Sequence, residues 1–170
     1  FGPYQFPEKL IPIVILKALE GLPIPIYGNG DNIRDWLFVE DHIDALISVI
    51  NRGTIGQSYC IGGNNEKTNL EIANTICLAL DKKLPKKESY RNLIKFVIDR
   101  PGHDKRYAIN SKKIKEELGW EPRNTFNSAI SKTLDWYLNN RRWCEKVAKN
   151  GNYYGKRIGI FNSTNQSINI

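Results

Sequence analysis

Two arginines stand where a guanidinium group needs an anion. Arg34 lies inside a stretch that reads as a strand, within the run YGNGDNIRDWLFVEDH, and an unpaired charge is costly to bury. Arg100 ends another predicted strand, and Pro101 and Gly102 after it predict a turn of the kind where functional loops lie. A planar guanidinium can hold a phosphate by two parallel hydrogen bonds. The two arginines therefore predict a diphosphate site. For Arg34, the alternative is a salt bridge to one of the carboxylates near it in sequence.

Several other chemistries are excluded because their motifs are missing from the sequence. It contains no G-x-G-x-x-G dinucleotide loop, no G-x-S-x-G elbow and no H-E-x-x-H zinc helix. Two histidines, His42 and His103, could each transfer a proton, although a solitary histidine is more often structural. We expect His42, at a predicted helix start, to make local hydrogen bonds. We predict no metal site.

Composition predicts a globular protein with a small anionic partner. The chain has 170 residues, of which 41% are hydrophobic and 25% charged, and its net charge is +7. Nucleic-acid surfaces gather their basic residues into one stripe, whereas here they are scattered. We therefore expect no nucleic acid and favour a nucleotide diphosphate. The apolar run 10–16 is too short to cross a bilayer, so we expect no membrane partner.

The cysteines and the first residue bear on location and completeness. Cys60, Cys77 and Cys144 are far apart, which argues against a zinc site or a disulfide framework and favours a reducing compartment. We therefore predict a cytoplasmic protein. The sequence has no methionine and begins with Phe1, so we interpret it as the downstream part of a longer protein. The alternative is that only a leader was removed.

Hydrophobic periodicity predicts a mixed α/β protein in which helices are in the majority. Pro12 is awkward inside the first helix, because an interior proline loses a hydrogen bond. Thr68 or Asn69 can cap the third helix. In the second helix, Ile43, Leu46, Ile47 and Ile50 fall on one face. The predicted helices span 7–20, 40–50, 70–81, 111–119 and 127–140, and the predicted strands span 24–27, 33–39, 58–63 and 94–100, with a further short strand within 101–110.

Four runs together resemble a known enzyme family. They are FGPYQFPEKLIP, YGNGDNIRDWLFVEDH, IGGNNEKTNLEI and DRPGHDKRYAIN. Over residues 1–143 the sequence is similar to the C-terminal half of the dTDP-glucose 4,6-dehydratases, which are extended short-chain dehydrogenases/reductases. The run around Arg34 is shared by many nucleotide-sugar enzymes, whereas the third and fourth runs are closer to the dehydratases. The resemblance implies the C-terminal portion of a Rossmann-type fold, helix-rich with short strands.

The resemblance also implies a set of substrate-binding residues. Arg34 and Arg100 would hold the diphosphate of dTDP-glucose with help from Asn69, and His103 would lie near the nucleotide sugar. Pro25 and Tyr27 would lie beside the thymine base, and Glu8, Lys9 and Leu10 would line the nucleotide end. Simpler roles stay open for several of these residues. They are strand packing for Tyr27, helix capping for Asn69, a solvated position for Lys9 and core packing for Leu10.

Members of the family oxidise C4 of the hexose with NAD, eliminate water across C5 and C6, and return the hydride to C6. Their NAD loop, Tyr-x-x-x-Lys pair and acid/base carboxylates lie upstream of the region that this sequence resembles. We therefore expect residues 1–150 to be a nucleotide-sugar-binding portion without catalytic or NAD-binding residues. This portion should be inactive alone. We expect a homodimer only for a full-length protein. We expect 151–170 to be a loosely held polar tail.

Two alternatives remain at this stage. The first keeps the superfamily and changes the sugar chemistry, as in a UDP-glucuronate decarboxylase or a 4-epimerase. The second is a non-enzymatic binding module that uses the same pocket or the basic segment RRWCEKVAK.

Overall fold

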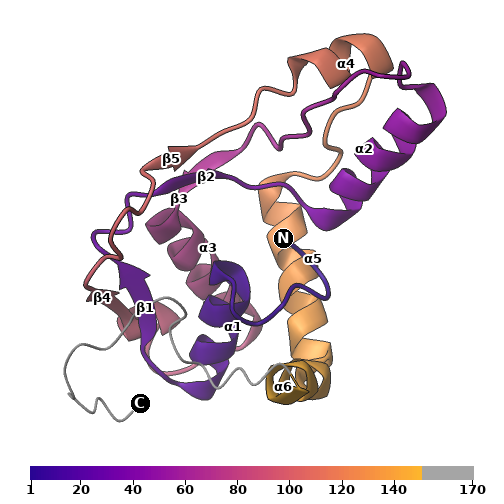
Figure 1. Ribbon diagram of the computed structural model, residues 1–170. Coiled ribbons are helices and arrows are strands. Elements are labelled where there is room, and N and C mark those ends of the chain that lie inside the picture. The colour runs from indigo at the N-terminus through magenta and orange to yellow at the C-terminus, as the bar shows by residue number, and fades with distance from the viewer. Residues whose placement is uncertain (151–170) are drawn as a thin grey trace.

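The chain forms an α/β structure dominated by helices (Figure 1), as predicted. A computed structural model describes residues 1–150; the predicted tail at 151–170 lies outside the described residues. The helices are α1 (Leu10–Glu20), α2 (Val39–Arg52), α3 (Asn69–Lys83), the 3-10 helix η1 (Tyr90–Leu93), α4 (Lys112–Leu118), α5 (Phe126–Asn139) and α6 (Arg141–Asn150). The strands are β1 (Ile24–Tyr27), β2 (Ile33–Asp35), β3 (Glu66–Thr68), β4 (Ile94–Val97) and β5 (Arg106–Tyr107).

Helix α1 begins later than the sequence pattern predicts. It starts at Leu10 after Lys9, so Pro12 occupies the third helical position. The first four amides of a helix have no partner inside it, and a proline there sacrifices no helical hydrogen bond. At the other end, Gly21 adopts a left-handed conformation with φ 71°, as glycine does most readily. Pro12 is therefore compatible with this helix.

Helix α3 begins at a capping box. The Thr68 hydroxyl accepts a hydrogen bond from the amide of Glu71, and the Glu71 carboxylate accepts one from the amide of Thr68. This reciprocal pair satisfies two donors at the helix start. Thr68, rather than Asn69, is therefore the capping residue, and Asn69 is the first residue of the helix.

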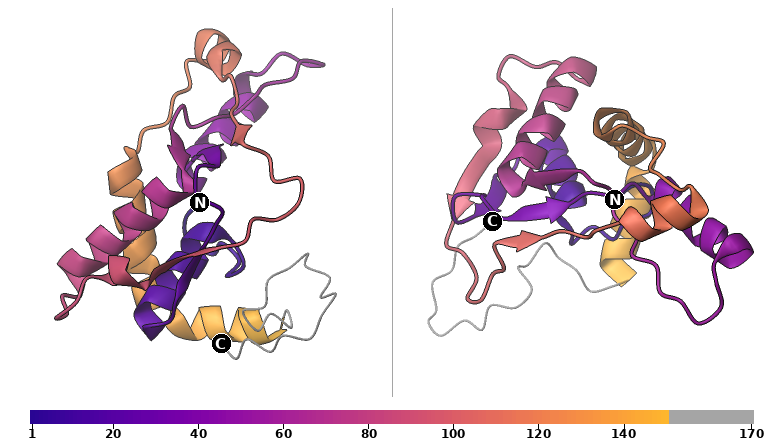
Figure 2. Two further views of the ribbon diagram at one scale, coloured as in Figure 1. Left: turned by 90° about the vertical axis from the view of Figure 1, so that its left-hand side faces the viewer. Right: turned by 90° about the horizontal axis from the view of Figure 1, so that it is seen from above.

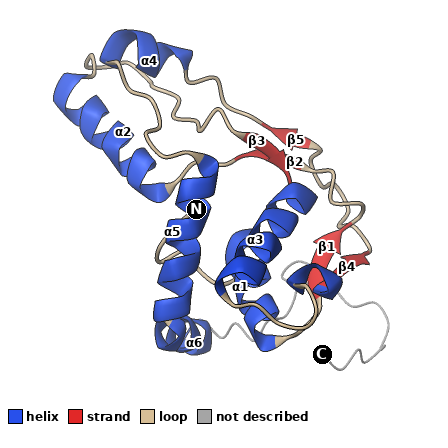
Figure 3. Cartoon of the chain, turned by 180° about the vertical axis from the view of Figure 1, so that it is seen from behind, coloured by secondary structure: helices blue, strands red, loops and turns tan. Residues whose placement is uncertain are grey.

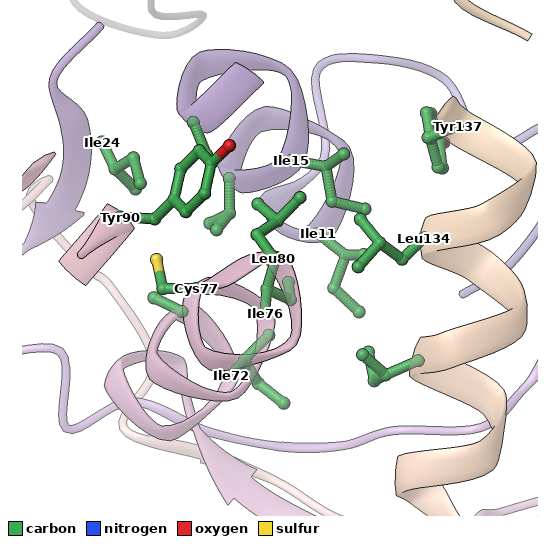
Figure 4. Packing of buried hydrophobic residues seen from close by; sticks show 14 of the residues in the cluster. Ile11, Ile15, Ile24, Ile72, Ile76, Cys77, Leu80, Tyr90, Leu134 and Tyr137 are labelled. Carbon is green, nitrogen blue, oxygen red and sulfur yellow. The ribbon is translucent and has the colours of Figure 1, made fainter. Parts of the chain in front are cut away.

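The main core lies where α1, α3 and α5 meet, with β1 and η1 closing one side. Figure 4 shows Ile11 and Ile15 of α1 facing Ile76 and Leu80 of α3, with Leu134 of α5 beside them. Side chains of α1 and α3 supply most of these contacts because each helix places its apolar residues on one face. This core fixes the ends of β1 and the start of α3, which carry predicted site residues.

The strands form two small sheets instead of one large one. In the first, β1 and β4 are parallel, with Tyr27 opposite Val97. In the second, the order is β3-β2-β5, with β2 antiparallel to β3 and parallel to β5. We call this second sheet the arginine sheet, because Arg34 lies in its central strand.

Helices α2 and α4 lie together at the opposite end of the molecule from α1 (Figure 2 and Figure 3). Their shared core is small and consists of Ala45, Ile114, Leu118 and Trp120. We call α2, α4 and the segments packed with them, residues 37–61 and 109–121, the α2–α4 region. The predicted apolar face of α2 points outward, and Ile43, Leu46, Ile47 and Ile50 are all exposed.

Several predicted elements differ from the structure. The strand predicted at 58–63 is absent, and these residues form an irregular segment in which Cys60 is exposed. The strand predicted at 33–39 ends at Asp35, and 66–68 forms β3, which was not predicted. Helix α6 was also not predicted. Within residues 1–150, no helix combines the length and apolar character that a membrane span requires.

Candidate functional site

Arg34 occupies the centre of the arginine sheet. It lies opposite Lys67 of β3 and opposite Tyr107 of β5. Its Nη1 donates to the carbonyl oxygen of Ile33 at 2.6 Å, and its Nη2 donates to that of Asp104 at 3.0 Å. The guanidinium carbon lies 4.5 Å from the centroid of the Tyr107 ring. Arg34 is thus oriented by neutral groups.

The salt-bridge alternative for Arg34 is not supported. Among the ion pairs of residues 1–150, none includes Arg34. The adjacent carboxylate of Asp35 points elsewhere and accepts hydrogen bonds from the amides of Gly63 (2.7 Å) and Asn65 (2.8 Å). Lys67 is opposite Arg34 in the register, and its Nζ lies 5.2 Å from the centroid of the Phe126 ring. The charge of Arg34 is therefore not neutralised by an ion pair within residues 1–150.

Arg100 lies in the segment between β4 and β5, the strand that carries Tyr107. It is exposed, and within residues 1–150 it too forms no ion pair. The hydrogen bond to Asp104 raises the pKa of the Tyr107 hydroxyl, and burial and the Asp104 charge act in the same direction. The charges of Arg34 and Arg100 both lower that pKa. Contact with the Tyr107 ring is shown for Arg34, and binding of one anion by both arginines stays a prediction.

His103 lies in the same segment and is held against Tyr27. Its Nδ1 is 2.7 Å from Oδ1 of Asp99, and its side chain is only 5% exposed. The Tyr27 and His103 rings meet edge to face, with centroids 6.1 Å apart. The hydrogen bond with His103 is the main reason why the pKa of Asp99 is lowered. Pairing of β1 with β4 thus joins two predicted site residues from distant parts of the sequence.

Three further predicted site residues, Pro25, Tyr27 and Asn69, lie in β1 and at the start of α3. Ile24 and Ile26 are buried, while Pro25 and Tyr27 are half-buried. Alternate residues of a strand face opposite sides, so Pro25 and Tyr27 share the side away from the core. Asn69 begins α3, immediately after the strand that pairs with Arg34.

Three predicted residues lie apart from this group. Glu8 and Lys9 precede α1 and form an ion pair with each other at 2.5 Å, and Lys9 is the more exposed of the two. Leu10 is half-buried and packs against the main core. No hydrogen bond or ion pair among residues 1–150 connects these three residues to Arg34, Arg100 or His103.

A hollow of about 290 Å³ occurs elsewhere, between α2 and the segment after α4. Its charged residues already have partners, because Arg52 donates to Ser48 at 2.5 Å and Arg123 is 3.7 Å from Asp44. None of the predicted site residues lines this hollow. Arg34 is half-buried and Arg100 is exposed, and neither forms an ion pair within residues 1–150. We therefore take the arginines and not the hollow as the candidate site.

The sequence is matched by the model of the family described as GDP-mannose 4,6 dehydratase over residues 1–133. The chain belongs to this family. A curated relative from Shigella flexneri, dTDP-glucose 4,6-dehydratase, is 59% identical over 153 residues, covering 90% of this chain and 42% of the relative. The resemblance to the dTDP-glucose 4,6-dehydratases is therefore confirmed. This chain spans less than half the length of that relative.

Solved structures of dTDP-glucose 4,6-dehydratases are also similar to this chain. The dTDP-glucose 4,6-dehydratase from Bacillus anthracis, in complex with NAD, matches with a TM-score of 0.77 and 46% identity, over 86% of this chain and 44% of that chain. The Streptomyces venezuelae dTDP-glucose 4,6-dehydratase, with NAD and a second ligand bound, also matches with a TM-score of 0.77, at 38% identity over the same shares. The predicted fold class is confirmed. NAD is a ligand of both relatives.

The sequence reasoning missed the groups that hold the predicted residues in place. Tyr107 and Asp104 contact Arg34, and Asp99 contacts His103. The available signal was strand alternation, because residues opposite each other on neighbouring strands share a face. That signal could be used only once the pairing of β2 with β5 was known.

Proposed function

We propose that this chain provides the nucleotide-sugar-binding portion of a dTDP-glucose 4,6-dehydratase, a lyase that converts dTDP-glucose to dTDP-4-keto-6-deoxyglucose and water. The observation that carries the proposal is that Arg34, held against the Tyr107 ring, forms no ion pair with a carboxylate among residues 1–150. The exposed Arg100 lies in the segment that leads to the strand of Tyr107. The 59% identity to the Shigella flexneri relative supports the choice of substrate class.

In this proposal each residue binds a different part of the substrate. Arg34 and Arg100 hold the diphosphate through charge-assisted hydrogen bonds, and Asn69 adds a donor at the positive end of α3. Tyr27 offers a flat ring to the base, with Pro25 beside it, and His103 lies near the sugar. The Glu8, Lys9 and Leu10 segment lines the nucleotide end.

The 170 residues do not fit an NAD site of their own. They contain no G-x-G-x-x-G loop, the motif that holds the pyrophosphate of a dinucleotide at a helix N-terminus. The chain by itself is therefore proposed to be inactive.

A homodimer is proposed only for a full-length protein, which has both this portion and the portion of the relatives that this chain does not match. The three free cysteines fit a cytoplasmic location.

We further propose that this remaining portion packs on the outward face of α2. Relatives are more than twice as long as the part that this chain matches, and Ile43, Leu46, Ile47 and Ile50 are apolar and exposed. An apolar patch of this kind is typical of a contact surface. Ile47→Glu together with Ile50→Glu should prevent association with the unmatched portion of the Shigella flexneri relative. Leu78→Glu, at a comparably exposed position on α3, should not.

The function is tested by thermal unfolding with and without dTDP. The chain is measured alone and mixed with the unmatched portion of the Shigella flexneri relative. A ligand that binds only the folded state raises the Tm, so dTDP should raise it in the mixture. Arg34→Ala should abolish the shift, whereas Arg142→Ala, which removes the same charge from exposed α6, should preserve it. Equal shifts in both variants, or no shift in the wild type, would contradict the proposal.

The same assay separates dTDP-sugars from UDP-sugars. If the base is read at Pro25 and Tyr27, UDP-glucose should produce a smaller shift than dTDP-glucose at equal concentration. A larger shift with UDP-glucose would favour a UDP-sugar enzyme.

A further inference from the structure

We propose that Tyr107 is a positioning residue that holds the Arg34 guanidinium in the orientation needed to receive a diphosphate. This inference rests on the proposed function and assigns a role to a residue outside the predicted substrate-binding set. Tyr107 is 54% exposed, so core burial does not explain its ring. The contacts of that ring are with Arg34 and Asp104.

The pairing of strands places Tyr107 directly beside Arg34. Strands β2 and β5 are parallel, and Arg34 and Tyr107 are opposite residues in their register. The guanidinium carbon lies 4.5 Å from the ring centroid, within the range in which a cation is attracted to an aromatic face. The ring therefore restrains one face of the guanidinium plane.

Asp104 restrains both residues. Its carbonyl oxygen accepts from Nη2 of Arg34 at 3.0 Å, while its carboxylate accepts from the Tyr107 hydroxyl. Asn32 Nδ2 donates to the same carbonyl at 3.3 Å. The backbone is fixed nearby, because the amide of Ile33 donates to the carbonyl of Lys105 at 2.7 Å. The ring of Tyr107 is thus anchored at its hydroxyl end while its face contacts Arg34.

This arrangement orients the arginine without neutralising it. The Asp104 carboxylate accepts from a neutral hydroxyl, and Arg34 donates to two carbonyl oxygens and contacts a ring face. An arginine side chain loses rotamer freedom when it binds a ligand, and restraining it beforehand lowers that cost. The charge stays available to a nucleoside diphosphate.

The test uses dTDP as the probe and the chain mixed with the unmatched portion of the Shigella flexneri relative, the mixture in which dTDP is expected to bind. Affinity is measured by isothermal titration for wild type, Tyr107→Leu and Tyr107→Phe. Tyr107→Leu should weaken dTDP binding by about fivefold, the loss expected for an exposed cation–π contact. Tyr107→Phe keeps the ring and loses the hydroxyl anchor, so it should weaken binding less than Tyr107→Leu does. In an Arg34→Ala background, Tyr107→Leu should have no further effect. Equal losses in both backgrounds would overturn the positioning role.

A second readout does not depend on nucleotide binding. The Arg34 Nε–Hε signal in a proton–nitrogen correlation spectrum should carry a ring-current shift in wild type and Tyr107→Phe and lose it in Tyr107→Leu. An unchanged signal in Tyr107→Leu would overturn the inference. If the signal moves as expected while the wild-type protein binds no dTDP, the proposed function fails and the contact between Tyr107 and Arg34 stands.

Discussion

The main core and the α2–α4 region differ in how completely they bury their apolar residues. In the main core, Ile11, Ile76, Leu80 and Leu134 are at most 1% exposed, and three helices enclose them (Figure 4). The α2–α4 core has only four buried residues, while the other face of α2 stays exposed. The main core therefore buries its apolar residues, whereas the α2–α4 region leaves one apolar face of α2 exposed.

This difference shows what an amphipathic pattern does and does not reveal. The spacing of Ile43, Leu46, Ile47 and Ile50 identifies one face of a helix, and the structure confirms that face. The pattern does not show whether the segment that covers it belongs to the same 170 residues. In Figure 1 the arginine sheet lies above α3 and to the left of α2.

The largest loss of stability is expected for a substitution in the main core. Leu80→Ala should lower the free energy of unfolding by about 2–5 kcal/mol, because a buried leucine leaves a cavity. Leu78, on the same helix, is 48% exposed, and Leu78→Ala should cost less than about 1 kcal/mol. Urea unfolding measures both variants. Similar losses for the two would contradict the assigned packing of α3.

The second largest loss of stability is expected where the main core and the α2–α4 region join. Asp41 of α2 is 2% exposed and accepts hydrogen bonds from the amides of Arg123 and Asn124 at 3.0 and 3.4 Å and from Nδ2 of Asn124 at 2.9 Å. Asp41→Ala should cost about 1–3 kcal/mol, because it leaves those donors without an acceptor.

Hydrogen exchange provides the local check on Asp41. The amides of Arg123 and Asn124 should lose protection in Asp41→Ala, whereas Asp44→Ala on the same helix should leave both amides protected. Unchanged protection in Asp41→Ala would contradict the idea that this carboxylate joins the two regions.

The reactivity of the cysteines also distinguishes the main core from the α2–α4 region. Cys77 and Cys144 are buried in the main core, and Cys60 is exposed on the segment next to α2. Burial raises the pKa of the Cys77 thiol to about 12, and the thiolate is the reactive form. A thiol reagent should therefore label Cys60 rapidly between pH 7 and 9, and Cys77 only when the protein unfolds. Rapid labelling of Cys77 in the native protein would contradict a closed core.

The smallest effect is expected on the open face of α2. Ile50 is 81% exposed, so Ile50→Ser should change the stability of this chain by no more than about 0.5 kcal/mol. Ile114→Ala, inside the small α2–α4 core, is the contrasting change and should cost about 2 kcal/mol or more. A large loss in Ile50→Ser would show that the face is covered within this chain.

Local signals in the sequence predicted much of the fold. The helices that became α1, α2, α3, α4 and α5 and the strand at 24–27 were predicted, because each has its own period or its own start and stop residues. The prediction of a strand at 58–63 was wrong, because a strand also requires a neighbouring strand for its hydrogen bonds. Its β-like composition is not sufficient without a partner.

Part of the candidate site could also be predicted. A guanidinium inside a strand required an anion, and this requirement identified Arg34 from chemistry alone. The position of Arg100 relative to Arg34 depends on the pairing of β2 with β5 and of β1 with β4, which no local pattern specifies. Tyr107, Asp104 and Asp99 were missed for the same reason.

The central claim is that Arg34 and Arg100 bind one diphosphate together. Isothermal titration of dTDP into the wild-type protein, Arg34→Ala, Arg100→Ala and the double variant tests it most directly. Each single variant should bind about tenfold or more weakly, because it loses charge-assisted hydrogen bonds. The double variant should lose less than the product of the two single losses. Wild-type affinity in either single variant would contradict the claim.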